Sequence, residues 1–413
     1  MIRLNKIQNI SVVNIIIFII IINILPVFIS STIIPGFNRT RSYLLLTIVV
    51  FLIQNLLILF YFYNKIKINK DVIIYSLLFS LIQIITIILY LIKNNTSNIM
   101  DILNVFVKFF SFFTIIGIFS KYKISKIQYS NFLKFLLFLG MIAIIFNFVR
   151  YYNEMLNIFY VNSAYEVKFN SFFINRNTYA QLLIFSFTSS FILYNQFKTK
   201  RYLLYTFIIL LNLIFTFSRS ALLVVIIFII SYYILSLKRK IINIIPLFAI
   251  PIIIIILLSF SQINEFIINI MIRPQSGTTS RVFLWRIGID ILAKNSIIFG
   301  VGNYKGIELM QSYGFSQREF HNFYIETLVT GGILELIVYI IIFIEIIKKV
   351  VKLKKADIIF YKWYVSLIVS IVFYLFFESA SFLTIGYVGF LFTSIFILIP
   401  LTYYNYNKLN KLI

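Results

Sequence analysis

The feature that most constrains this chain is a succession of apolar stretches, each about 20 residues long, that runs from one end of the sequence to the other. A helix needs roughly 20 apolar residues to cross ~30 Å of hydrocarbon. The 413 residues are 61% hydrophobic and only 12% charged, whereas soluble domains are closer to half apolar and about a quarter charged. A bilayer must solvate this apolar surface, so we predict an all-α, polytopic membrane protein with a single integral membrane domain over 1–413.

The hydropathy pattern predicts about twelve transmembrane helices. Region 202–237 is assigned to two of them, because a single helix of 36 residues would reach about 54 Å and basic clusters flank both of its ends. We therefore expect a tight hairpin there, turning at Ser218-Arg219-Ser220. The first stretch follows Arg3 and Lys6, is too long for a signal-peptide core, and is predicted as an uncleaved span. The predicted spans are 10–30, 43–63, 72–92, 101–120, 132–150, 178–196, 202–217, 219–237, 241–259, 322–347, 361–379 and 384–404.

The net charge of +24 is explained by topology rather than by nucleic-acid binding. If the N-terminus is cytoplasmic, 23 of the 37 basic residues fall in cytoplasmic segments, which also hold only two acids, Asp71 and Asp357. This distribution follows the positive-inside rule. We predict a multi-pass protein of the bacterial inner (cytoplasmic) membrane with both termini cytoplasmic and no nucleic-acid partner. With no cysteine and one histidine, disulfides, thiolate metal sites and multi-histidine metal sites are excluded.

Arginine is distributed differently from lysine. Nine of the twelve arginines fall on the predicted outer face, although lysine dominates the cytoplasmic side. The planar guanidinium fork suits phosphate and carboxylate oxygens, so this enrichment predicts an anionic ligand outside. Two predicted extracytoplasmic loops, 151–177 and 260–320, are long enough to carry function.

The longer loop contains a predicted amphipathic helix over 281–294, which Ser280 can cap. Its mixture of apolar and charged residues is typical of a helix that lies at the membrane surface, with Trp285 at headgroup level. Arg281 and Arg286 would then lie at the depth of lipid phosphates. Two interpretations stay open: the pair grips a lipid-linked diphosphate, or it pairs with ordinary lipid headgroups.

Two further positions are candidates for chemistry. His321, which precedes Asn322 where the long loop meets a span, would act as a general base or orient a substrate; the alternative is a capping or interfacial histidine. Arg219 follows a short span and is expected to dip toward the hydrocarbon, where a charge is costly and usually functional. The start of the next helix there also favours an anion. The alternative is an arginine that snorkels to the headgroups.

Two short motifs and several ionisable residues give weaker evidence of function. Gly300-Val301-Gly302 has the pattern of a tight turn, and Asn175-Arg176-Asn177 can cap the span that follows it. Five ionisable residues receive no assigned role: Glu319 and Glu378 as outer carboxylates, and Lys108, Glu335 and Glu345 within spans.

In chain order, these motifs resemble the O-antigen polymerase and O-antigen ligase family. The matching stretches are 169–183, 216–223, 280–304 and 321–336. Order, spacing and topology agree over roughly 165–345, whereas the first 150 residues share only hydropathy. The pattern is an S-R-S turn at Ser218/Arg219/Ser220, an R-x3-W helix at Arg281/Trp285, a G-x-G at Gly300/Gly302, an H-N at His321/Asn322 and a glycine pair at Gly331/Gly332.

The resemblance implies a membrane-embedded, metal-independent glycosyltransferase without a cofactor. Such enzymes transfer a glycan from an undecaprenyl diphosphate carrier on the outer leaflet. In this hypothesis Arg219 and Arg281 bind the diphosphate and stabilise the leaving group, and His321 orients or deprotonates the acceptor hydroxyl. The positions expected to bind substrate are Arg286, Arg176, Trp285, Asn322, Gly300 and Gly302.

The choice of activity within the family is between polymerase and ligase. The high Ile, Phe, Tyr and Asn content resembles polymerases of variable polysaccharide clusters, which favours joining carrier-linked repeat units into O-antigen (the lipopolysaccharide glycan) or capsule. The alternative is a ligase that transfers the finished glycan to a lipid or protein acceptor. Expected partners are the undecaprenyl-diphosphate-linked oligosaccharide, membrane lipids and a chain-length-determining membrane protein.

Two other classes of membrane protein are alternatives to a glycosyltransferase. A flippase or transporter would predict internal repeats, broken helices and ionisable residues near the membrane midplane. The sequence has no internal repeat, and its candidate residues gather on one outer loop, which favours an enzyme. A non-catalytic assembly partner is the remaining alternative.

Overall fold

The computed structural model describes residues 11–33, 41–62, 70–94, 99–119, 122–156, 169–236, 279–315, 319–379, 382–384 and 386–409. Every regular element among these residues is helical, as the all-α prediction requires. The α-helices are α2 (Val12–Phe28), α3 (Arg41–Phe62), α4 (Lys70–Asn94), α5 (Ile99–Ser111), α6 (Lys126–Arg150), α7 (Tyr152–Leu156), α8 (Arg176–Phe197), α9 (Lys200–Phe215), α10 (Arg219–Ser236), α13 (Thr279–Lys294), α14 (Asn303–Ser312), α15 (Phe323–Lys352), α16 (Ile358–Tyr374), α17 (Tyr387–Thr393) and α18 (Ile399–Leu409). Three π-helical stretches continue α2, continue α5 and join α17 to α18: Ile29–Ile33, Phe112–Phe119 and Ser394–Leu398.

Six helices of the described part are long and apolar enough to cross a membrane, which is the composition of a membrane protein. Two shorter apolar helices, Leu45–Leu59 and Ile358–Tyr374, accompany them. Helical segments occupy eleven of the twelve predicted spans. The ninth, 241–259, lies outside the described residues, so the total of twelve crossings stays a prediction. The six long spans are Val12–Thr32, Ser76–Lys93, Lys126–Arg150, Arg219–Ser236, Phe323–Lys355 and Tyr387–Asn407.

Helix α4 has its polar side chains inside and its apolar side chains outside. Ser76, Gln83 and Thr86 are buried against the protein, whereas Leu81 is 51% exposed and Ile92 is 71% exposed. A helix at the surface of a soluble protein has the reverse arrangement. This pattern is expected where hydrocarbon, not water, surrounds the bundle.

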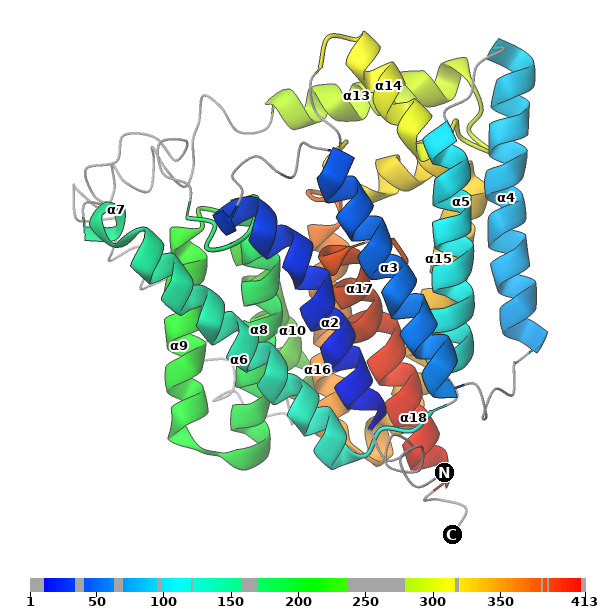
Figure 1. The fold of residues 1–413 in the computed structure, drawn as a ribbon. Coiled ribbons are helices and arrows are strands. Elements are labelled where there is room, and N and C mark those ends of the chain that lie inside the picture. Colours follow the sequence, from blue (N-terminus) through cyan, green and yellow to red (C-terminus); the bar gives the residue numbers. More distant parts are fainter. Residues whose placement is uncertain are drawn as a thin grey trace.

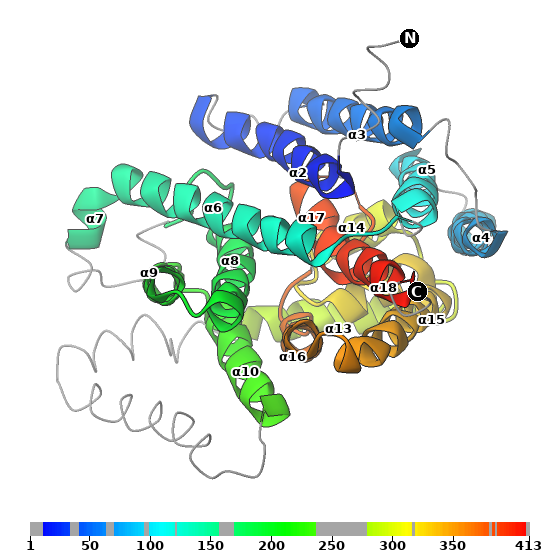
Figure 2. The same ribbon diagram turned by 90° about the horizontal axis from the view of Figure 1, so that it is seen from below.

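The long helices run alongside one another, and α13 lies across one end of the bundle, with α14 beside it (Figure 1). We call this the α13 end. The beginning of α2 and the end of α18 both lie at the opposite end (Figure 1). Seen along the bundle, α4 is at one edge and α9 is at the other, with α16 and α17 between them (Figure 2). The α13 end therefore corresponds to the predicted extracytoplasmic face, and the side of each terminus remains a prediction.

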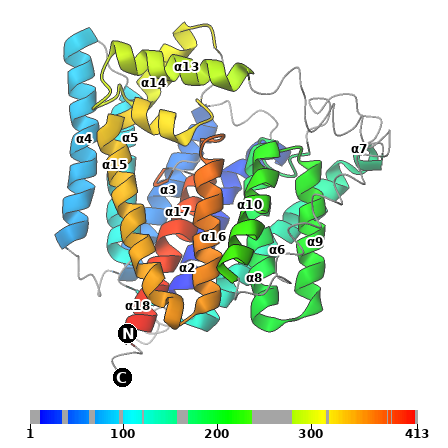
Figure 3. The same cartoon turned by 180° about the vertical axis from the view of Figure 1, so that it is seen from behind.

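The predicted hairpin within 202–237 is present. Helix α9 ends at Phe215, the chain turns over Thr216–Ser218, and α10 begins at Arg219. Phe217 in this turn has a φ of 53°. Helix α9 packs mainly against α8, and α10 packs mainly against α16 (Figure 3). The hairpin therefore brings the start of α10 to the α13 end, beside the segment that follows α16.

Helix α15 was predicted as one continuous span, but it is broken at Gly331 and Gly332. Both glycines depart from helical dihedral angles, and Gly332 has a φ of 69°, so the helical hydrogen-bond ladder is interrupted there. The segment 297–302 supplies partners for four backbone groups beside the break, which would otherwise be buried without a partner. The replacement bonds are Val301 N to Val329 O at 2.8 Å, Gly302 N to Thr330 O at 3.0 Å, Ile333 N to Ile297 O at 2.9 Å and Leu334 N to Ile298 O at 3.4 Å.

The two glycine motifs of the sequence meet at this break. A Cβ on Gly332 would lie 2.0 Å from the carbonyl oxygen of Ile298, and one on Gly300 would lie 2.5 Å from that of Val329. Only glycine permits such close approach of two backbones. The motifs thus form one structural joint between α15 and the segment that links α13 to α14.

Candidate functional site

The carboxylate of Glu378, just beyond α16, is the point where four separate segments meet at the α13 end. Its side chain is only 5% exposed. Its Oε1 atom accepts hydrogen bonds from Arg281 Nη2 at 2.8 Å, Asn177 Nδ2 at 3.0 Å and Ser220 Oγ at 3.3 Å. The His321 ring lies on the other oxygen, with Nδ1 3.8 Å from Oε2. We call these five residues the Glu378 cluster.

Arg281 stands in the first turns of α13 and uses its guanidinium fork twice. Nη2 bonds Glu378, and Nη1 donates to the carbonyl oxygen of Phe377 at 2.7 Å. Its side chain remains 27% exposed. Trp285, one turn later, lies with its ring centroid 6.5 Å from that of Phe377. The start of α13 is therefore fixed in orientation by the segment after α16, while the Arg281 side chain as a whole stays partly accessible.

His321 adopts a left-handed backbone conformation, with a φ of 51°. Its Nδ1 atom lies 3.8 Å from Glu378 Oε2 and 3.8 Å from Glu319 Oε2, which is beyond hydrogen-bond length. Interaction with Glu378, and to a smaller extent with Glu319, raises the pKa of His321 above its usual value of 6.5, although burial and Arg281 oppose this. The ring is thus held between two carboxylates that favour its protonated form.

The S-R-S turn and the N-R-N segment both reach the cluster through the residue after the arginine. Arg219 is the first residue of α10 and is half-buried, and its neighbour Ser220 donates to Glu378. Asn175 caps α8, as predicted, by accepting from Thr178 N at 2.8 Å. Arg176, half-buried, begins that helix, and Asn177 reaches Glu378. Two arginine-bearing helix starts therefore adjoin Arg281 and His321.

Arg286 lies apart from this convergence. It is exposed on α13, five residues beyond Arg281, which places it about 140° around the helix from Arg281. The two arginines predicted to act together on this helix therefore face different directions.

Three predicted substrate-binding residues have clear structural roles. Asn322 is buried and caps α15, because its Oδ1 accepts from Tyr324 N at 3.0 Å and Ile325 N at 3.1 Å. Gly300 and Gly302 have φ values of 70° and 97° and belong to the joint with α15. Contact of these three residues with substrate stays a prediction.

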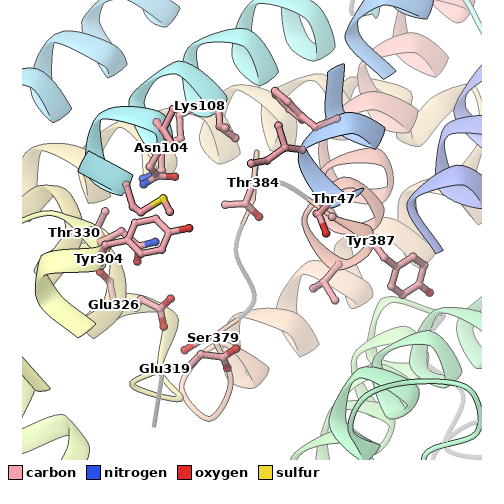
Figure 4. Close-up of a pocket in the computed structure, with 18 of the residues that line it drawn as sticks. Thr47, Asn104, Lys108, Tyr304, Glu319, Glu326, Thr330, Ser379, Thr384 and Tyr387 are labelled. Carbon is pink, nitrogen blue, oxygen red and sulfur yellow. Dashed lines mark hydrogen bonds between the residues drawn. The ribbon is translucent and has the colours of Figure 1, made fainter. Parts of the chain in front are cut away.

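A cavity of about 780 Å³ lies next to the cluster, lined by parts of α3, α5, α15 and the segment that leads into α17. In the close-up, Glu319, Glu326 and Ser379 lie at one end of this space, and Asn104 and Lys108 lie on another side (Figure 4). Glu319 belongs both to this lining and to the surroundings of His321. The cluster and the cavity are therefore adjacent.

Sequence reasoning missed the central role of Glu378. The available signal was a carboxylate just past an apolar span, at the same end as the outer arginines. It also left Lys108 and Glu335 unassigned, although they form a buried ion pair with Nζ 2.6 Å from Oε1. Among the described residues, no group of three or more histidine or acidic side chains is placed to hold a metal ion.

Comparison with known proteins bears on the central part of the chain. Residues 204–340, about a third of the sequence, match the family model described as O-antigen ligase. The matched segment includes Arg219, Arg281 and His321, and it ends before Glu378. No curated protein matches the chain at a significant level. The family match confirms the resemblance drawn from the sequence motifs.

Proposed function

We propose that this chain, which belongs to the O-antigen polymerase and ligase family, is a glycosyltransferase that joins undecaprenyl-diphosphate-linked repeat units into O-antigen or capsular polysaccharide. The reaction would take place on the outer face of the bacterial inner membrane. The α13 end would lie on that side. The observation that carries the proposal is the convergence of Arg281, His321 and the S-R-S turn on the buried Glu378.

On the donor side, Arg281 and Arg219 would hold the carrier diphosphate. Glu378 and the Phe377 carbonyl fix the Arg281 guanidinium in advance, so little reorganisation is needed when charge develops on the leaving group. The N-terminus of α10, which begins at Arg219, adds a positive dipole end and backbone N–H groups that favour an anion. These cationic groups would supply the charge neutralisation that many transferases obtain from a metal, so we propose metal-independent transfer.

On the acceptor side, His321 would orient or deprotonate the attacking hydroxyl. The hydroxyl oxygen bonds to the anomeric carbon of the donor sugar, and the bond from that carbon to the diphosphate breaks. The carrier diphosphate leaves with the electron pair, and the hydroxyl proton passes to the neutral imidazole. Because Glu378 and Glu319 favour the protonated ring, deprotonation would use the fraction of His321 that is neutral at the working pH.

Arg286, Arg176 and Trp285 are proposed as supporting contacts. Arg286 is exposed on α13 and is suited to the headgroup region or to the second lipid-linked chain. Arg176 begins α8 next to Asn177, close enough to the cluster for the second diphosphate. Trp285 packs near Phe377 and would position the start of α13 at headgroup depth.

Two features of the fold, which the sequence did not reveal, are arguments for a transporter. Helix α15 is broken within a span, and Lys108 and Glu335 form a buried ion pair, both of which are typical of transporters. The backbone groups at the break are bonded to segment 297–302, and both oxygens of Glu335 have partners. These features are thus satisfied within the protein, and the partly open groups lie in the Glu378 cluster, which favours an enzyme.

The first test is a polysaccharide gel from cells that lack this gene, complemented with wild type, His321→Ala or the exposed-site control Lys294→Ala. For a polymerase, deletion leaves a single repeat unit on the surface acceptor, and wild type and the control restore the ladder. His321→Ala should not restore it at equal protein level. Full-length chains stranded on the lipid carrier would instead identify a ligase. A complete ladder from His321→Ala would contradict the role given to the histidine.

A further inference from the structure

The cavity beside the Glu378 cluster differs from the cluster in charge. Its lining includes three carboxylates, from Glu319, Glu326 and Glu335, and a single cation, Lys108. Within the part of the chain that the structure describes, no arginine lines it. Lys108 is already paired with Glu335, so this lining offers no unpaired cation to neutralise a diphosphate, and a neutral ligand fits it better.

Hydrogen-bonding groups are numerous in this cavity. The lining contains Asn104, Thr47, Thr327 and Thr330 among apolar and aromatic side chains. Asn104 Nδ2 and Glu326 Oε2 are buried and have no hydrogen-bond partner among the described residues. A buried polar atom without a partner costs about 1–3 kcal/mol. A donor and an acceptor in this condition, lining one cavity, indicate a ligand that carries several hydroxyl groups.

The Lys108–Glu335 pair forms a wall of the cavity rather than a free binding group. Lys108 Nζ is 2.6 Å from Glu335 Oε1, and the Gln83 amide donates to the other carboxylate oxygen. Both charged side chains are almost fully buried. Their polar atoms are therefore occupied, and Thr47 and Thr330 donate to carbonyl oxygens of their own helices. The unpartnered atoms that remain for a ligand are Asn104 Nδ2 and Glu326 Oε2.

We infer that this cavity binds the uncharged sugar rings of the lipid-linked glycan, while the diphosphate stays outside it, at Arg281 and Arg219. The inference rests on the proposed function. It assigns the sugar part of the lipid-linked substrate to the cavity and the diphosphate part to the neighbouring arginines. The volume of the cavity, about 780 Å³, lies within the ~300–1,000 Å³ of typical small-molecule sites. Glu319 lines the cavity and also faces His321, so a sugar bound here would present a hydroxyl near the imidazole.

The test is binding of the repeat-unit oligosaccharide, released from the host's carrier lipid by mild acid and therefore free of diphosphate. Full-length protein in lipid nanodiscs is titrated by calorimetry, without any transfer reaction. Wild type should bind, and Asn104→Leu should weaken binding by about tenfold or more, as expected for a lost hydrogen bond to a buried group. The isosteric Thr327→Val serves as a second variant. An excess of inorganic diphosphate should not displace the oligosaccharide.

The matched control is Asn195→Leu, since the Asn195 amide donates within its own helix, at 2.9 Å to Phe191 O, and Asn195 is not among the cavity-lining residues. It should bind like wild type. Equal binding by wild type, Asn104→Leu and Thr327→Val would overturn the inference, as would no binding to wild type or displacement by inorganic diphosphate. Wild-type protein that binds the oligosaccharide but forms no product with carrier-linked units would contradict the proposed function and leave this inference standing.

Discussion

Two buried carboxylates, Glu335 and Glu378, lie in similar settings but differ in how completely they are satisfied. Glu335 bonds Lys108 through one oxygen and Gln83 through the other. Glu378 receives three donors on Oε1, whereas His321 Nδ1 lies 3.8 Å from Oε2, beyond hydrogen-bond length. The first is a closed ion pair between α4, α5 and α15. The second retains acceptor capacity next to a partly exposed arginine and histidine.

This difference indicates what each carboxylate is for. A buried pair with all of its polar atoms used contributes to holding helices in place, and breaking it leaves an uncompensated charge. A carboxylate that holds a guanidinium and faces an imidazole, with room left at both, suits a site where charge and protons move. We therefore assign Glu335 to structure and Glu378 to the candidate active site.

The largest effect is expected from breaking the closed pair. Lys108→Met leaves Glu335 buried without its cation, and should lower the free energy of unfolding by about 3–5 kcal/mol. Lys108→Met/Glu335→Leu removes both charges and should recover most of this loss. Thermal unfolding of the purified full-length protein, followed by size exclusion, measures both variants. A single variant as stable as wild type would show that the pair does not hold the helices.

Substitutions in the Glu378 cluster should lower enzyme activity more than they lower protein stability. Arg281→Gln should slow polymer formation from carrier-linked repeat units by about 10²–10³-fold, the usual cost of losing one pre-oriented donor. Arg281→Lys should not restore the rate, because one ammonium cannot replace the fork that bonds both Phe377 and Glu378. Lys294→Ala, which breaks an exposed pair with Asp290 in the same helix, is the control. A wild-type rate for Arg281→Lys would refute this role.

The sequence predicted much of the helical framework, because hydropathy and basic flanks act locally. The hairpin before Arg219, the cap at Asn175 and a helix over most of 281–294 all follow from residues close in the chain. The predicted cap at Ser280 is wrong, because α13 begins at Thr279 and Ser280 lies inside its first turn. The ordered motifs also predicted the O-antigen polymerase and ligase family, and residues 204–340 match the family model described as O-antigen ligase.

The joints between distant segments could not be predicted in this way. Asp101 in α5 accepts from Tyr304 N at 2.8 Å, at the start of α14 some 203 residues later. Glu378 lies outside every motif, and its importance comes only from the segments that converge on it. The break at Gly332 was visible as a glycine pair, but its partner segment 297–302 depends on tertiary contacts. Such pairings are set by the fold rather than by local pattern.

The charge of His321 should change with pH, and it can be followed alone because the chain has one histidine. Glu378 raises the pKa of His321, so the stabilisation from protonated His321 is full below about 6.5, the unfolded value, and is lost as pH rises through the folded value. Glu378→Gln should lower the folded pKa toward that value. NMR titration of histidine-labelled protein follows this one ring directly. An unchanged midpoint in Glu378→Gln would mean that Glu378 does not set the charge of His321.

The smallest effect is expected at Asn322. Asn322→Ala removes the cap of α15 and should cost about 1 kcal/mol of stability, while Asn322→Ser, which retains a capping oxygen, should lose less. Thermal unfolding and the rate of polymer formation are measured on the same samples. A loss of rate in Asn322→Ser without a loss of stability would show that the amide also contacts substrate, as the sequence motif predicted.

The most direct test of the central claim is the polysaccharide gel from deletion cells that carry Glu378→Gln. The glutamine keeps the size of the side chain but removes the charge that holds Arg281 and faces His321. We expect normal protein level and thermal stability close to wild type, together with loss of the polysaccharide ladder that wild type restores. A full ladder from Glu378→Gln at equal protein level would contradict the account, because the cluster would then be a structural junction like the Lys108–Glu335 pair.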